Sequence, residues 1–203
     1  DKILTDFKLE GVLLTLNLNE PIKYGNLVNI EITYLLKPKI IGGILGYSAQ
    51  CINFSDWYPF IPPYEDGKGW IVHQPAEVGE YLVYDMADFD LTLELTGQDG
   101  LVIAGSTQVQ PLAVGQYQLQ SKNSRNITFS VSDRYIVLTK EIEGVTINGY
   151  VYEGDEESGW AAVNNSAKAL MLYGELFGMP YPHKTFTVVE SDFQDGMEFD
   201  GLY

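Results

Sequence analysis

The sequence predicts a mainly β protein, in which an antiparallel β-sandwich or saddle-shaped domain is followed by a helix and a strand. Most apolar segments are short, alternate with polar residues and are separated by glycine- or proline-containing turns. Only residues 158–177 repeat apolar side chains with a helical period. Apolar residues make up 45% of the 203 residues and aromatic residues 13%, which excludes a disordered chain.

The expected strands fill the first two-thirds of the chain. Residues 28–35 alternate most regularly, a pattern typical of an antiparallel strand with one face in solvent. Gln98-Asp99-Gly100 is a turn signal. We expect strands at residues 12–18, 28–35, 40–47, 81–84, 89–95, 101–104, 116–120, 127–131, 135–139 and 145–152.

The sequence pattern changes after residue 152, where an acidic stretch is followed by the helical period. The expected inner face of the helix carries Val163, Ala167, Leu170, Met171, Gly174 and Phe177. Gly178 is placed for a left-handed C-cap, Pro180 stops the helix, and residues 185–190 form a strand. A helix and strand after a β-only run predict two domains, residues 1–152 (truncated at its start) and residues 153–203.

The composition limits the partners of the chain. Its net charge of −16 argues against nucleic acid as a partner, because phosphate backbones would be repelled. The single cysteine, Cys51, excludes an internal disulfide, and we expect it to be a small buried side chain. No apolar run approaches the ~18 residues of a membrane span. Without an initiator methionine or a signal peptide, both ends are expected to lie inside a longer protein.

The residues of this chain predict neither a metal site nor a catalytic group. His73 and His183 are 110 positions apart, whereas a helical zinc site needs two histidines four positions apart. Nothing resembles a G-x-S-x-G nucleophile turn or a glycine-rich phosphate loop. We therefore expect no cofactor and no catalytic residue within these 203 residues.

Two stretches remain as candidate binding sites. In Asp195-Gly196-Met197-Glu198, a carboxylate beside glycine suits a cationic ligand such as a free amino group; the alternative is a solvated charge at a strand edge. An aromatic loop is compatible with a sugar-stacking platform or with a small satellite core. Its aromatic residues are Trp57, Tyr58, Phe60, Tyr64 and Trp70.

The order of several short motifs resembles the aminopeptidase N and leukotriene hydrolase family of zinc metallopeptidases, the gluzincins, and especially its bacterial members. The resemblance covers most of the chain and ends on a motif similar to Gly-x-Met-Glu-Asn. The segments that carry it are residues 56–60, 79–81, 88–93, 105–107, 169–182, 186–190 and 195–202. It implies a β domain followed by the start of a thermolysin-like α+β catalytic domain.

The resemblance also implies a function. Glu198 would hold the α-amino group of a peptide substrate, with the backbone of Asp195, Gly196 and Met197 positioning the peptide. The chain departs from the family pattern at Asp195, in place of glycine, at Phe199 and at Asp200, where bacterial members often have proline. The family's His-Glu-x-x-His zinc helix follows this motif, so zinc is expected only in a longer parent and this chain alone would be inactive.

The partners follow from the same resemblance. They are the peptide substrate, the remainder of the catalytic domain and a second copy covering the apolar helix face. A bacterial extracytoplasmic or membrane-associated parent is favoured over a cytoplasmic one. The alternatives are a non-catalytic interaction scaffold with this fold and an acidic carbohydrate-binding or adhesion module.

Overall fold

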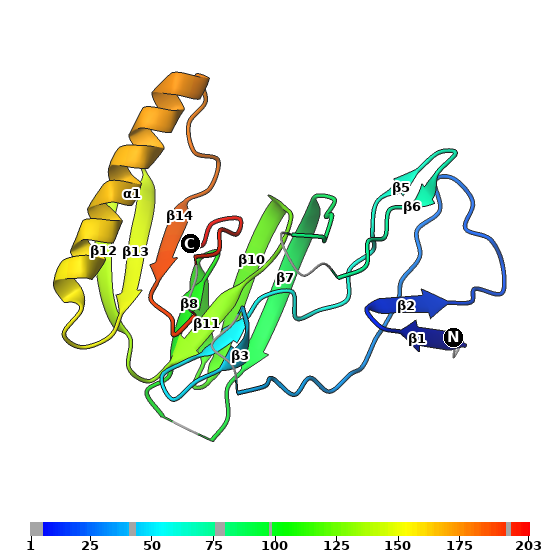
Figure 1. The fold of residues 1–203 in the computed structure, drawn as a ribbon, viewed down its shortest axis with the longest axis horizontal. Coiled ribbons are helices and arrows are strands. Elements are labelled where there is room, and N and C mark those ends of the chain that lie inside the picture. Colours follow the sequence, from blue (N-terminus) through cyan, green and yellow to red (C-terminus); the bar gives the residue numbers. More distant parts are fainter. Residues whose placement is uncertain (1–5, 41–43, 76–79, 98, 194–195) are drawn as a thin grey trace. The chain divides into compact units, whose positions relative to one another are not determined.

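A computed structural model describes residues 6–40, 44–75, 80–97, 99–193 and 196–203. These residues form antiparallel sheets and one helix, so the predicted mainly β class is confirmed (Figure 1). The chain divides into two compact units, Asp1–Lys37 with Tyr58–Asp85 and Pro38–Trp57 with Met86–Tyr203. The expected domain boundary near residue 153 falls inside the second unit and stays a prediction.

The first unit contains two short hairpins. Strands β1 (Phe7–Glu10) and β2 (Leu13–Leu16) pair antiparallel across a turn in which Gly11 has a φ of +60°. Strands β5 (Tyr64–Glu65) and β6 (Gly69–Trp70) form the second hairpin. The Tyr64 and Trp70 rings meet edge to face with centroids 5.0 Å apart.

The predictions of strands at residues 28–35 and 81–84 are wrong. Neither stretch is paired with a neighbouring strand in the part of the chain that the structure describes. Val28, Ile30 and Ile32, the apolar face of the first stretch, are 41–45% exposed. Alternation defines a face, but a strand also needs a neighbour to satisfy its backbone hydrogen bonds, and the local sequence does not specify that neighbour.

The second unit holds two antiparallel sheets built from the middle of the chain. One has the order β3 (Leu45–Tyr47), β4 (Ile52–Phe54), β11 (Phe129–Ser132), β8 (Val102–Gly105). The other has the order β7 (Ala87–Glu94), β10 (Gln116–Ser124), β9 (Val109–Ala113). Leu119 of β10 is fully buried, and the Phe54 and Phe129 rings stack 4.7 Å apart.

A third sheet in this unit is mixed and carries the helix. Strands β12 (Ile136–Ile142) and β13 (Val145–Val151) form a hairpin whose turn residues, Glu143 and Gly144, both have positive φ. Strand β14 (Thr185–Val189) pairs parallel with β13. Parallel neighbours need a crossover, and here α1 (Glu156–Phe177) supplies it and lies along one face of the sheet (Figure 1).

The helix packs closely on the sheet because a glycine stands on each side of the contact, Gly149 in β13 and Gly159 in α1. A Cβ on Gly149 of β13 would lie 2.6 Å from Val163 Cγ2, and one on Gly159 would lie 2.6 Å from Val151 Cγ1. Val163 and Ala167 are buried, and Leu170 packs against them. Gly178 adopts the expected left-handed C-cap, with a φ of 65°. Among the described residues, no helix is long and apolar enough to cross a membrane.

The inner face predicted for α1 is wrong at Met171 and Phe177, which are 41% and 74% exposed. The helix has 22 residues and extends about 33 Å, whereas β12 and β13 have 7 residues each and extend about 23 Å. The sheet therefore ends before the helix does.

Candidate functional site

The candidate site is the closing segment, residues 191–203, of which 194 and 195 lie outside the described residues. Its last residues run parallel to β14 and extend the mixed sheet. Thr187 N–H donates to the Gly201 carbonyl at 2.8 Å, and Tyr203 N–H donates to the Thr187 carbonyl at 2.9 Å. Val189 N–H donates to the Tyr203 carbonyl at 2.8 Å. Backbone pairing with β14 therefore holds the C-terminal end of the closing segment, which we call its exit.

The exit also requires glycine at position 201. Gly201 has a φ of +82°, and a Cβ there would lie 2.1 Å from the Ser106 carbonyl oxygen. The conformation and the close approach each disfavour a side chain. The adjoining turn is closed by Phe199 N–H, which donates to the Leu202 carbonyl at 2.8 Å. Leu202 is then buried, with 5% exposure.

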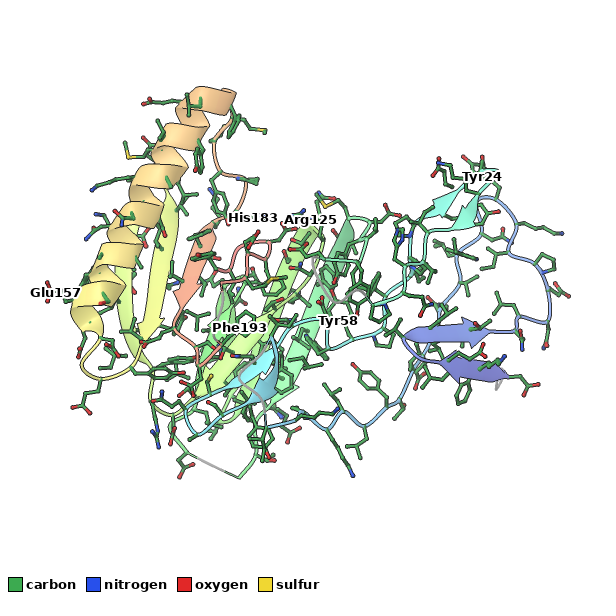
Figure 2. The ribbon with its side chains drawn as sticks, viewed as in Figure 1. Tyr24, Tyr58, Arg125, Glu157, His183 and Phe193 are labelled. Atoms are coloured by element: carbon green, nitrogen blue, oxygen red, sulfur yellow. The ribbon has the colours of Figure 1, made fainter. Side chains whose placement is uncertain are left out.

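A charged pair reinforces this turn. The Arg125 backbone N–H donates to Asp200 Oδ2 at 2.7 Å, and its guanidinium Nη2 and Nε donate to Oδ1 at 2.9 and 3.3 Å. Arg125 is labelled in Figure 2. Burial would raise the pKa of Asp200, but the hydrogen bonds and charge of Arg125 lower it overall. Burial, with a smaller contribution from the Asp200 charge, raises the pKa of Tyr181 to about 12.

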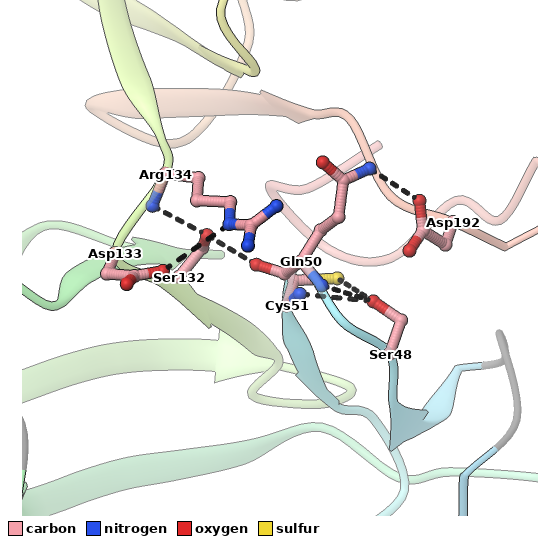
Figure 3. Close-up of polar contacts among 7 residues, drawn as sticks. All are labelled: Ser48, Gln50, Cys51, Ser132, Asp133, Arg134 and Asp192. Atoms are coloured by element: carbon pink, nitrogen blue, oxygen red, sulfur yellow. Dashed lines mark hydrogen bonds and ion pairs between the residues drawn. The ribbon is translucent and has the colours of Figure 1, made fainter.

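The N-terminal end of the closing segment, its entry, is held by side-chain hydrogen bonds that act as tethers. Ser191 Oγ accepts a hydrogen bond from Asn53 Nδ2 at 2.7 Å, and Asn53 Oδ1 accepts one from Ser130 at 2.7 Å. Gln50 Nε2 donates to Asp192 Oδ1 at 2.9 Å (Figure 3). Hydrogen bonds from Ser48 and Gln50 lower the pKa of Asp192. The segment is thus held at both ends by side chains of the antiparallel part of the unit.

The predicted binding residues lie between these tethers. Gly196 and Met197 line a cavity, whereas Glu198 is exposed and does not line it. Asp195 lies outside the described residues. The structure therefore brings two of the four predicted residues to one cavity wall and presents Glu198 to solvent beside it.

The cavity has a volume of about 290 Å³. Among its apolar lining residues are Phe129, Val188, Phe193, Met197, Phe199 and Tyr203, and its polar lining includes Asn53, Ser55, Thr128, Ser130 and Ser191. The buried Thr128 hydroxyl has no hydrogen-bond partner among the described residues. An apolar wall with a few polar groups suits a compact, mainly apolar ligand group.

Glu190 joins β14 to the closing segment and was not predicted as a site residue. Its Oε2 accepts a hydrogen bond from Tyr152 N–H at 2.9 Å, and its carbonyl accepts one from the Tyr135 hydroxyl at 3.2 Å. Burial, followed by the negative charges of Asp155 and Asp192, raises the pKa of Glu190. The carboxylate therefore bonds toward the start of α1, and Glu190 is also the charged residue among those that line the cavity.

The sequence interpretation also missed Arg125 and Asn53 as residues that hold the site. The one available signal was Asp200, an acidic residue in the closing motif. Arg125 is one of two arginines in a strongly acidic chain, which makes it a natural partner for that carboxylate. Asn53 gave no signal, because an isolated asparagine occurs on most surfaces.

The residues of the aromatic loop are divided between the two units. Trp57 belongs to the second unit, where its Nε1 donates to the Ile127 carbonyl at 3.2 Å and its ring meets Phe129 edge to face. Tyr64 and Trp70 belong to the first unit and are 60% and 58% exposed. Cys51 is buried, as expected, and its Sγ lies 3.7 Å from Ser191 Oγ.

Metal ligands do not gather in the described part of the chain: no three His, Cys, Asp or Glu side chains there are placed to hold an ion. The two histidines lie in different units. The described residues thus do not fit a zinc ion, and no chemistry is assigned to one here. No family model matches the chain, and no curated protein matches its sequence.

Proposed function

We propose that this chain is the β domain and the first catalytic-domain elements of a zinc aminopeptidase of the gluzincin type. In this proposal Glu198 binds the free α-amino group of a peptide, and the zinc ligands belong to sequence outside these 203 residues. The observation that carries the proposal is the closing segment, tethered at both ends, with Glu198 exposed beside a cavity that Met197 lines.

The physical argument concerns preorganisation. A carboxylate on a backbone that is already ordered binds a cation without the entropic cost of ordering a loop. A charge-assisted hydrogen bond to an ammonium group is about twice as strong as a neutral one. The cavity beside it would accept the apolar side chain of the first peptide residue. Zinc, in the complete enzyme, would supply the activated water.

Binding of a peptide amine tests this proposal on the chain itself. We expect a dipeptide amide with a free amine to shift the amide NMR signals of residues 196–203 at lower concentrations than its N-acetylated form, which keeps only the side-chain contact with the cavity. Glu198→Gln should remove this preference for the free amine. Glu157→Gln changes an exposed glutamate in the first turn of α1 and is the matched control. Equal binding of both peptides would contradict the proposal.

Catalysis is tested separately, on the full-length product of the gene, because the proposal places the zinc ligands outside these 203 residues. With zinc, it should release N-terminal residues from peptides, and Glu198→Gln should raise KM for them. The 203-residue chain should show no turnover with zinc. The absence of a His-Glu-x-x-His sequence in the longer product would contradict the enzymatic part and favour an interaction scaffold.

One observation favours a second function, carbohydrate binding by the hairpin of β5 and β6. The exposed Tyr64 and Trp70 rings lie 5.0 Å apart at an interplanar angle of 74°, and exposed aromatic faces stack on sugars. A glycan array probed with the wild-type chain and with Trp70→Ala would decide. Retention of no glycan by the wild type would exclude this function.

A further inference from the structure

The pair formed by Arg125 and Asp200 is the most specific polar contact of the closing segment. Asp200 uses both oxygens to accept three hydrogen bonds from one residue, a backbone N–H and two guanidinium nitrogens. Its side chain is only 15% exposed, whereas that of Arg125 is 59% exposed. The contact joins residues 75 positions apart and ties the connection between β10 and β11 to the closing segment.

The position of this contact matters more than its strength. Asp200 lies in the turn between Phe199 and Leu202, two residues after Glu198. The sheet pairing beyond the turn acts through the backbone of residues 201–203, and the entry tether acts at Ser191 and Asp192. On the exit side, Asp200 is therefore the side-chain anchor closest in sequence to Glu198.

We propose that Arg125 is a positioning residue: by holding Asp200 it fixes the turn that presents Glu198 to a ligand amine. This inference rests on the proposed function of Glu198. Without the contact, the turn would gain backbone freedom, and binding would have to order it again. Arginine is suited to this task because its rigid fork places two donors on one carboxylate, whereas the lysine ammonium acts as a point charge.

The experiment measures the affinity of the 203-residue chain for a dipeptide amide with a free amine and for its N-acetylated form. We expect Arg125→Ala and Asp200→Asn to weaken free-amine binding about tenfold, and Arg125→Lys about threefold, because lysine, unlike alanine, keeps the positive charge. Affinity for the acetylated peptide should not change. Arg134→Lys, at the other arginine, whose Nε lies 4.0 Å from Asp133, is the matched control.

Thermal unfolding of each variant shows that binding is measured on folded protein. A purely structural role would lower the unfolding temperature but leave the ratio of the two affinities unchanged. An unchanged ratio in Arg125→Ala, together with loss of amine binding in Glu198→Gln, would overturn the positioning role and leave the proposed function standing. If Glu198→Gln binds the amine like wild type, the proposed function and this inference both fail.

Discussion

The layer of α1 on β12, β13 and β14 and the closing segment lie next to one another in sequence but are held by different forces. In the layer, Ile147 and Val163 are fully buried, and glycines let the helix approach the sheet. The closing segment is held in its conformation by backbone pairing, a charged pair and a glycine with positive φ. Apolar packing thus holds the layer together, whereas the closing segment depends on polar contacts, of which the charged pair responds to pH.

The largest expected effect is the loss of a side chain from the layer. Ile147→Ala should lower the free energy of unfolding by about 2–5 kcal/mol, because it removes buried methylenes and leaves a cavity beneath α1. Urea denaturation followed by circular dichroism measures this change. Leu176→Ala, at a helix position that is 67% exposed, is the control and should change stability by less than about 0.5 kcal/mol. Equal losses in the two variants would contradict the packing of α1 described here.

A smaller effect is expected where the closing segment leaves the sheet. Gly201→Ala should cost about 1–3 kcal/mol, because alanine disfavours positive φ and its Cβ would collide with the Ser106 carbonyl. Hydrogen exchange should speed up at the amides of Thr187, Val189 and Tyr203, which bond across this edge. Gly178→Ala separates the two causes, since Gly178 also has positive φ but nothing lies within 4 Å of its Cβ position. Gly178→Ala should therefore lower the free energy of unfolding by less than Gly201→Ala does.

The smallest effect is electrostatic and depends on pH. The pKa of Asp200 is lowered in the folded state, so its contribution to stability is present above the unfolded pKa and is lost as the pH falls through the folded pKa. Asp200→Asn should therefore reduce stability at neutral pH, by less than about 1 kcal/mol because Arg125 is largely exposed, and the difference should shrink in acid. Urea unfolding between about pH 7 and pH 3 measures it.

The ionisation of Glu190 should change stability with pH in the opposite direction to that of Asp200. Its folded pKa is raised, so its contribution is complete below the unfolded pKa and is lost as the pH rises through the folded pKa. Glu190→Gln should therefore lose no stability at neutral pH and should lose the pH dependence attributed to this carboxyl. A fall in stability with rising pH that persists unchanged in Glu190→Gln would show that another group causes it.

Several elements could be predicted from sequence because their causes are local. The period of Val163, Ala167 and Leu170 predicted the inner face of α1, and Gly178 predicted its end. The alternating residues 145–152 and the apolar residues 185–190 predicted β13 and β14 to within a residue or two. Each of these signals depends on residues that lie close together in the sequence.

Other features depended on partners far away in sequence. Residues 28–35 alternate as regularly as β13 does, yet β13 has a neighbouring strand on both sides, whereas residues 28–35 belong to none of the strands that the structure describes. Phe177 continues the apolar period of α1, but the sheet does not extend beneath it. Pattern alone cannot distinguish these cases, because it describes what a segment offers and not what receives it.

Local sequence was enough to predict the mainly β class, the helix with its cap and the strand that follows it, and it made the stretch around Glu198 a candidate site. The contacts that hold this stretch exist only in the folded chain: Arg125 meets Asp200 across 75 positions, and Asn53 meets Ser191 across 138. The physical reason is that secondary structure follows from short-range backbone and periodicity effects. A tether between distant side chains exists only after the sheets have brought its two ends together.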